Sequence, residues 1–270
     1  IFDQNPNNAF YIEESFPLDW MYPHLTPYGI IMKINREPLK ELTLEAMEKD
    51  RIFWRRYSRE RLVGDWVKPG NAPGGGATGT TIRDISQWAT RVHLRRDPAA
   101  RRGANPRFLR DNDAQKAYSK LRCAIAALYA WRANNTADLA KKQRLFFEAD
   151  FAYRQAYAFC PYAPEIIQRY VVNFLLPQLR FEEARQIVLT FRRMDPLNNY
   201  ANMILSHILT VEGEMLLQRK DHEGLVRLAN LAKDQLPDRK AYRQTHDRLL
   251  TMKVQSLIAL GRNEEALRTL

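Results

Sequence analysis

Apolar residues recur along much of this chain at the three- and four-residue spacing of amphipathic helices, most clearly between Pro164 and Asn199. The first half of that stretch carries Ile167, Tyr170, Val171, Phe174 and Leu175 on one face. The second half carries Phe181, Ala184, Ile187, Val188 and Phe191. Asp195-Pro196 ends the second helix, since proline cannot continue one, and Pro177 should shorten or bend the first by about a turn. The stretch therefore predicts a helical hairpin.

Two landmarks repeat around this hairpin. Prolines at 161, 196 and 237 lie 35 and 41 residues apart, and the small or apolar residues at 149, 184, 225 and 266 lie 35, 41 and 41 apart. The agreement predicts successive hairpins through residues 111–270. Their helices are expected at 112–133 with 139–159, at 164–194 as above, at 200–219 with 222–235, and from near 240 with a turn at 260–262, where the fourth hairpin is cut off. Asp111 is expected to cap the helix at 112–133, whose inward-facing residues are expected to be Ala117, Leu121, Ala124, Ile125, Leu128 and Trp131.

Phe181 after the turn, Glu182-Glu183-Ala184, and a proline about a dozen residues later resemble a tetratricopeptide repeat. The resemblance implies an all-α, tetratricopeptide-like helical-hairpin superhelix, here with an irregular, partly β-hairpin N-terminal cap. In such arrays the first helices line a concave groove that holds a protein or peptide. The candidate groove residues are Ile166, Arg169, Asn173, Leu176, Met203 and His207. Plain packing is the alternative, as is a clamp in which Arg169 and Asn173 grip a peptide carboxylate.

The N-terminal part differs in composition, so we divide the chain into a Pro/aromatic-rich cap at 1–38, a helical region at 39–110 and the repeat array at 111–270. In the cap, residues 10–12 and 29–34 could pair as strands. The middle region is expected to contain a helix at 39–66, a Gly-rich linker at 70–80, a helix that Thr81 caps and that runs through His93, and a basic loop at 94–111.

The phrase FYIEESFPLDWMYPHLTPYGIIMKINREPL, residues 10–39, resembles the segment after the last membrane span in bacterial polytopic proteins similar to protein O-mannosyltransferases. The resemblance implies the soluble tail of a membrane glycosyltransferase-like protein, membrane-associated through a portion preceding Ile1, on an unspecified side of the membrane. The family's acidic catalytic residues belong to the membrane portion, so none is carried over to this chain.

The formal net charge of +11 favours an anionic partner. Positive charge is densest in the loop at 94–111, where we single out Arg95, Arg96, Arg101, Arg102, Arg107 and Arg110. A solvated loop is the simplest interpretation. Contact with an anionic membrane surface or an acidic partner is the functional one, and a free-standing adaptor binding RNA or another polyanion is the alternative. Phe108 is the loop's single aromatic residue, too few for a base-stacking platform.

Enzyme chemistry finds little support in the sequence. The Gly-rich linker lacks the lysine of a phosphate loop. A sugar site could be imagined from Glu13, Glu14, Asp19, Trp20, Tyr22 and His24, although aromatics flanked by prolines favour a packed cap. The histidines at 93, 207, 222 and 246 lack metal-ligand spacing, and Cys123 and Cys160 are interpreted as buried apolar residues, with a disulfide left open. We therefore expect a non-catalytic protein-interaction module without catalytic, cofactor or metal residues.

Overall fold

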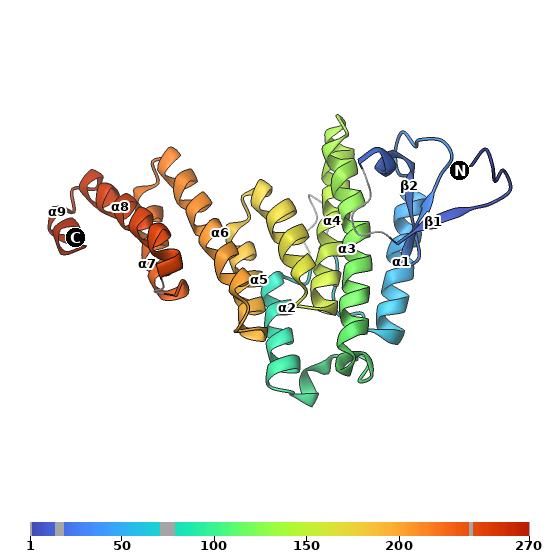
Figure 1. Ribbon diagram of the computed structural model, residues 1–270, viewed down its shortest axis with the longest axis horizontal. Helices are drawn as coiled ribbons and strands as arrows, with labels where there is room; N and C mark the ends of the chain where they lie inside the picture. Colours follow the sequence, from blue (N-terminus) through green and yellow to red (C-terminus); the bar gives the residue numbers. More distant parts are fainter. Residues whose placement is uncertain (1, 14–18, 71–78, 238–239, 270) are drawn as a thin grey trace. The chain divides into compact units, whose positions relative to one another are not determined.

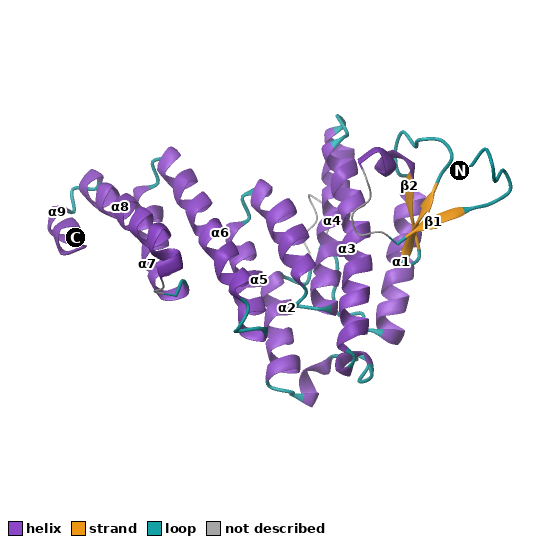
Figure 2. Ribbon diagram, in the orientation of Figure 1, coloured by secondary structure: helices purple, strands orange, loops and turns teal. Residues whose placement is uncertain are grey.

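The computed structural model describes residues 2–13, 19–70, 79–237 and 240–269 (Figure 1). The described chain is predominantly helical with one small three-stranded sheet, which confirms the helical class expected from the apolar spacing (Figure 2). Its contacts divide it into two compact units, Ile1–Phe174 and Leu175–Leu270, called unit 1 and unit 2 below.

The sheet lies in the N-terminal cap and consists of β1 (Phe10–Ile12), β2 (Leu25–Tyr28) and β3 (Ile31–Ile34) in the order β1-β3-β2. The expected pairing of residues 10–12 with 29–34 is present as the antiparallel pair β1/β3, whereas β2 was not predicted. A 3₁₀ helix, Asp19–His24, leads into β2. The sheet contributes Leu25 and Met32 to the core of unit 1, and β2 contacts the first helix.

The first helix, α1 (Leu44–Arg61), is shorter at both ends than the expected 39–66. Thr43 sets its start, because its Oγ1 accepts a hydrogen bond from the Ala46 amide at 3.1 Å. At the other end Ser58 Oγ donates to the carbonyl of Gly64 at 2.6 Å, and Gly64 adopts a φ of +88°, which an α-helix does not allow.

The second helix, α2 (Ile82–Ala89), begins at the predicted cap, where Thr81 and Asp84 exchange hydrogen bonds in a capping box. It continues as a π-helix, Thr90–Leu94, and the basic loop that follows contains two 3₁₀ turns, Pro98–Arg101 and Phe108–Arg110. Most of the expected Gly-rich linker, residues 71–78, lies outside the described residues.

The hairpin α3 (Asn112–Asn134) and α4 (Leu139–Phe159) confirms the expected helices to within one residue (Figure 1). Asp111 and Asp138 cap the two helices through their carboxylates. One detail of the predicted core is wrong. Ala117 was expected to face inward but is exposed, while Arg122 and Tyr129 are buried.

The next helical segment, Ile166–Leu175, is a π-helix rather than the α-helix expected, since three- and four-residue apolar spacing over so few turns does not fix the helix type. It ends two residues before Pro177, which lies in a 3₁₀ turn, Leu176–Gln178. This confirms that Pro177 shortens the helix.

Unit 2 continues with α5 (Phe181–Met194), α6 (Asn199–Gln218) and α7 (His222–Gln235). A 3₁₀ turn (Lys240–Tyr242), α8 (Arg243–Ala259) and α9 (Asn263–Thr269) complete it. Each of these α-helices contacts the next, and the buried side chains include Phe191, Leu205, Leu209, Leu225 and Leu257. The expected helix at 222–235 and turn at 260–262 are both present.

Candidate functional site

The expected groove residues divide into buried and exposed side chains. Ile166, Arg169 and Leu176 are buried, with Arg169 only 3% exposed, so these three contribute to packing. A clamp built on the Arg169 guanidinium would therefore have no cation at the surface of unit 1. Asn173 in unit 1 is exposed. Met203 and His207, one turn apart on α6 of unit 2, are also exposed.

The six arginines of the basic loop are all exposed, and the loop that carries them has a defined conformation. Asp97 anchors it, because its carboxylate accepts from the Arg91 guanidinium at 2.6 Å and from the Ala99 amide at 2.9 Å. The Arg91 side chain lowers the pKa of Asp97. The Asn105 amide donates to the Leu62 carbonyl at 2.7 Å and ties the loop to the end of α1. The exposed arginines therefore extend from a backbone that these hydrogen bonds fix in place.

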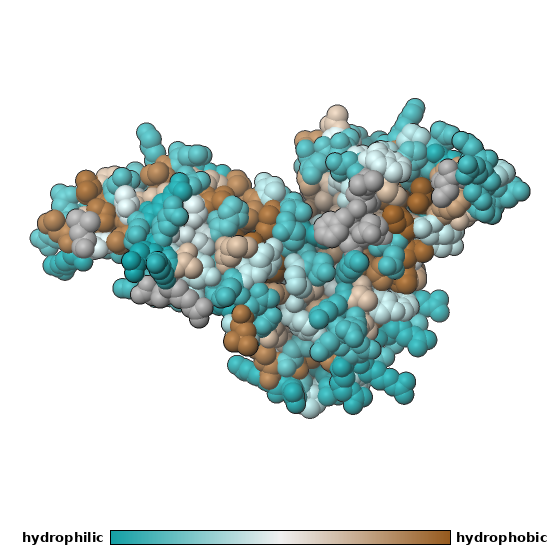
Figure 3. Space-filling model, viewed as in Figure 1, coloured by the Kyte–Doolittle hydropathy of each residue, from teal (hydrophilic) through white to brown (hydrophobic). Residues whose placement is uncertain are grey.

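Three of these arginines meet in one pocket, which we call the arginine pocket. Its volume is about 560 Å³, and it is lined by Val92, His93, Arg96, Arg101, Pro106, Leu109, Arg110 and Asn112. Figure 3 shows hydrophilic residues over much of the lower part of unit 1, where Figure 1 draws the segment between α2 and α3. Arg95, Arg102 and Arg107 do not line the pocket, and the Arg102 guanidinium instead lies over the Trp66 ring at 4.9 Å.

The charge in the arginine pocket is uncompensated. Among the described residues, Arg96, Arg101 and Arg110 have no ion-pair partner, and the lining contains no carboxylate. Arg110 Nε donates to the Pro106 carbonyl at 3.1 Å, which orients that side chain. Guanidinium groups present their N–H donors in a planar fork that matches phosphate and carboxylate oxygens. The pocket is thus suited to an anionic group.

His93 forms the inner wall of the pocket between two aromatic rings, those of Trp88 and Tyr162, at centroid distances of 5.8 and 5.9 Å. Burial lowers its pKa to about 4, so the ring is neutral at physiological pH. Its Nε2 atom is buried and makes no hydrogen bond within the described part of the chain. A neutral imidazole leaves the pocket's charge to its arginines.

The sequence also raised a sugar site in the cap, a metal site and a disulfide. Glu13 and Asp19 are exposed, His24 Nδ1 lies 2.9 Å from the Asn35 carbonyl, and none of the three lines the arginine pocket; Glu14 lies outside the described residues. Within the described ranges no group of His, Cys, Asp or Glu could hold a metal ion. Cys123 and Cys160 are free and buried, as interpreted, and burial raises the pKa of each thiol to about 12.

The arginine-rich segment was evident from the sequence, but the pocket was not. Its other walls come from the end of the π-helix at His93 and from Asn112 at the start of α3, and only the fold brings these together. In the sequence His93 was a single histidine without the spacing of metal ligands, so nothing marked it as part of a pocket. A second pocket, between the cap and the α3/α4 hairpin, also had no sequence signal.

Comparison with known proteins identifies no relative: no family model, no curated protein and no solved structure matches this chain. Within the described ranges, none of the helices has the length and apolar content needed to cross a bilayer.

Proposed function

We propose that this chain is a non-catalytic interaction module whose arginine pocket binds the phosphate groups of an anionic phospholipid surface. The observation that supports it is the convergence of Arg96, Arg101 and Arg110 on one pocket without ion-pair partners among the described residues. Each arginine close to an anionic membrane contributes about 1 kcal/mol, so the three together would strengthen binding by roughly a hundredfold.

A membrane surface fits the site better than single-stranded RNA, the alternative partner. Binding to single strands uses exposed aromatic rings on which bases stack. Phe108 is only 5% exposed and packs edge-on against Tyr118 and Phe159, and the Arg102 guanidinium lies over the Trp66 ring. The basic loop therefore offers cations but no accessible ring platform.

The resemblance of residues 10–39 to the segment after the last span of O-mannosyltransferase-like proteins also supports a location near a membrane. We propose that the chain is the soluble tail of such a membrane protein, which would keep unit 1 near a bilayer. Anionic lipid would then hold the tail at the bilayer.

We also propose that the helical hairpins are tetratricopeptide-like repeats and that unit 2 binds a protein or peptide. The supporting observation is the exposure of Met203 and His207, one turn apart on α6, with Met203 53% exposed. An exposed methionine adapts readily to the side chains of a partner. The test compares the proteins that bind the full chain with those that bind a variant in which both residues are replaced by alanine. Loss of a bound protein in the variant supports this second function, and an unchanged set contradicts it.

The lipid proposal is tested by co-sedimentation with vesicles of phosphatidylcholine alone or with phosphatidylglycerol, at about 50 and 200 mM salt. We expect binding to the anionic vesicles, weakened by salt and lost when Arg96, Arg101 and Arg110 are replaced by glutamine. The matched control replaces Arg55, Arg56 and Arg61, exposed arginines of α1, with the same change in charge. Equal losses in the two triple variants, or tighter binding of single-stranded RNA than of vesicles, would contradict the proposal.

A further inference from the structure

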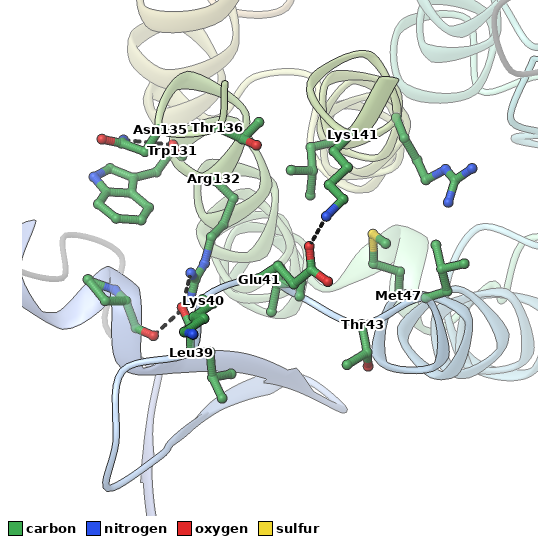
Figure 4. Close-up of a pocket in the computed structure, with 15 residues that line it drawn as sticks. Leu39, Lys40, Glu41, Thr43, Met47, Trp131, Arg132, Asn135, Thr136 and Lys141 are labelled. Carbon is green, nitrogen blue, oxygen red and sulfur yellow. Dashed lines mark hydrogen bonds and ion pairs between the residues drawn. The ribbon is translucent and has the colours of Figure 1, made fainter. Parts of the chain in front are cut away.

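A second pocket in unit 1 lies between the N-terminal cap and the tips of three helices (Figure 4). Its volume is about 520 Å³, within the range of sites that hold drug-sized molecules. The walls come from the cap and the segment before α1 (Pro23 and residues 39–43), from the start of α1, from the end of α3, and from the start of α4. We call it the cap pocket.

The inner part of the cap pocket is apolar. Leu42, Met47 and Leu145 line it and are 7%, 6% and 8% exposed. The Trp131 ring lines another side and stacks on Tyr22 of the cap at a centroid distance of 5.2 Å with an interplanar angle of 9°. A ligand with a hydrocarbon body could therefore bury that body against fixed side chains, at about 25 cal/mol for each Å² of apolar surface removed from water.

The cap pocket is held together by Arg132, which is 7% exposed. Its guanidinium donates to the carbonyls of Leu39 at 2.7 Å, Pro23 at 2.7 Å and Tyr22 at 3.1 Å, and so fastens the cap to α3 (Figure 4). Burial lowers the pKa of Arg132. Because these bonds occupy its terminal nitrogens, Arg132 holds the wall of the pocket in place and is not the cation that would pair with a ligand.

The remaining charges in the lining are three cations, Lys40, Lys141 and Arg144, and one anion, Glu41. Glu41 extends from the segment before α1 and forms an ion pair with Lys141 of α4, across the pocket (Figure 4). Both side chains are about half exposed, so the pair can open at little cost. Lys40 and Arg144 have no ion-pair partner among the described residues.

We propose that the cap pocket binds a small amphipathic carboxylate, whose hydrocarbon body packs on Leu42, Met47 and Leu145 and whose carboxylate replaces that of Glu41 beside Lys141. Glu41 then acts as an internal competitor that occupies the cation when the ligand is absent. Cations outnumber anions in the lining, which favours an anionic ligand. The Glu41 carboxylate already pairs with Lys141, which shows that a carboxylate fits beside this lysine. This site is independent of the arginine pocket.

The test is calorimetric titration of the full 270-residue chain with decanoate and, as the uncharged comparison, decanol. We expect decanoate to bind up to about fivefold more tightly than decanol, because an ion pair at a half-exposed site contributes up to about 1 kcal/mol. Glu41→Gln should tighten decanoate binding several-fold by removing the competitor, whereas Lys141→Gln should weaken it. The matched control is Glu45→Gln, which makes the same charge change at an exposed pair with Lys49 outside the pocket.

Two further measurements locate the site. The methyl NMR signal of Met47, assigned with a Met47→Leu variant, should move on addition of decanoate, while that of Met252 in unit 2 should not. Replacing Arg96, Arg101 and Arg110 by glutamine should leave decanoate binding unchanged. The proposal is overturned if decanoate does not bind, if decanol binds equally well, if Glu41→Gln and Glu45→Gln behave alike, or if the Met47 signal does not respond.

Discussion

Arg122 Nη1 of α3 donates to Asp50 Oδ2 of α1 over 2.8 Å, and the two side chains are 1% and 2% exposed. The pair lies in a wider polar network, because Tyr129 also donates to Asp50 at 3.0 Å and Arg122 Nε donates to Gln155 of α4 at 2.9 Å. The Arg122 guanidinium also lies over the Trp54 ring at 5.0 Å. This network joins α1, α3 and α4 in the core of unit 1.

Breaking this buried pair from one side should destabilise unit 1 strongly. We expect Arg122→Met to reduce the free energy of unfolding by about 3–5 kcal/mol, because it leaves the Asp50 carboxylate buried without its cation. The double variant with Asp50→Leu should recover most of that loss, since neither charge is then left unpaired. Urea unfolding measures both. A single variant that loses less than about 1 kcal/mol would show that water or a rearranged neighbour solvates Asp50.

The helices of this chain were predictable because their signals are local. Asp111 and Thr81 cap α3 and α2 where the sequence placed caps, and the apolar spacing gave the extents of α4 and α7. The buried Asp50–Arg122 pair was not predictable, because no spacing rule relates two charges 72 residues apart in sequence. The apolar pattern of α3 instead favoured Ala117, which is exposed.

Strand β2 and the two pockets were missed for related reasons. β2 contains Pro27, which argues against a strand, and its pairing with β3 supplies the missing context. The arginines of the basic loop were evident from composition, but which of them line a pocket depends on the path of the loop, where Arg96 and Arg102 adopt positive φ. The Glu41–Lys141 contact spans 100 residues and depends on how the cap meets α4.

Gly64 should be intolerant of any side chain, because it touches the basic loop. A Cβ there would lie 2.8 Å from the Arg102 carbonyl oxygen, and its φ of +88° is already unfavourable for other residues. Gly103 provides a matched control, since its φ is +81° but a Cβ there would meet nothing within 4 Å. We expect Gly103→Ala to cost about 1–2 kcal/mol of stability. Gly64→Ala should cost about 1–3 kcal/mol more, measured by thermal or urea unfolding, because it adds the steric conflict. Equal losses would contradict the close approach.

Titration of His93 should make stability depend on pH in a defined window. Its pKa is about 4 in the folded chain, below the ordinary value of 6.5, so the unfolded chain binds more protons between these values. The free energy of unfolding should therefore fall as the pH falls from about 6.5 to about 4, by up to about 3 kcal/mol. His93→Gln should remove this part of the slope in urea unfolding across that range. An unchanged slope would indicate that His93 is solvated.

Binding of an anion in the arginine pocket should raise the pKa of His93. The ring lines the pocket and is neutral because burial disfavours its charged form, and a phosphate group nearby would stabilise the protonated ring by direct attraction. By linkage, the singly charged form of inorganic phosphate should then bind more tightly as the pH falls toward the His93 pKa. NMR titration of the His93 ring with and without phosphate measures the shift, and chloride at matched ionic strength controls for screening. His207, exposed on α6 of unit 2, serves as the internal reference that phosphate should leave unchanged. In the variant with Arg96, Arg101 and Arg110 replaced by glutamine, the His93 shift should disappear. A phosphate-induced shift that persists in that variant would place the anion elsewhere in unit 1.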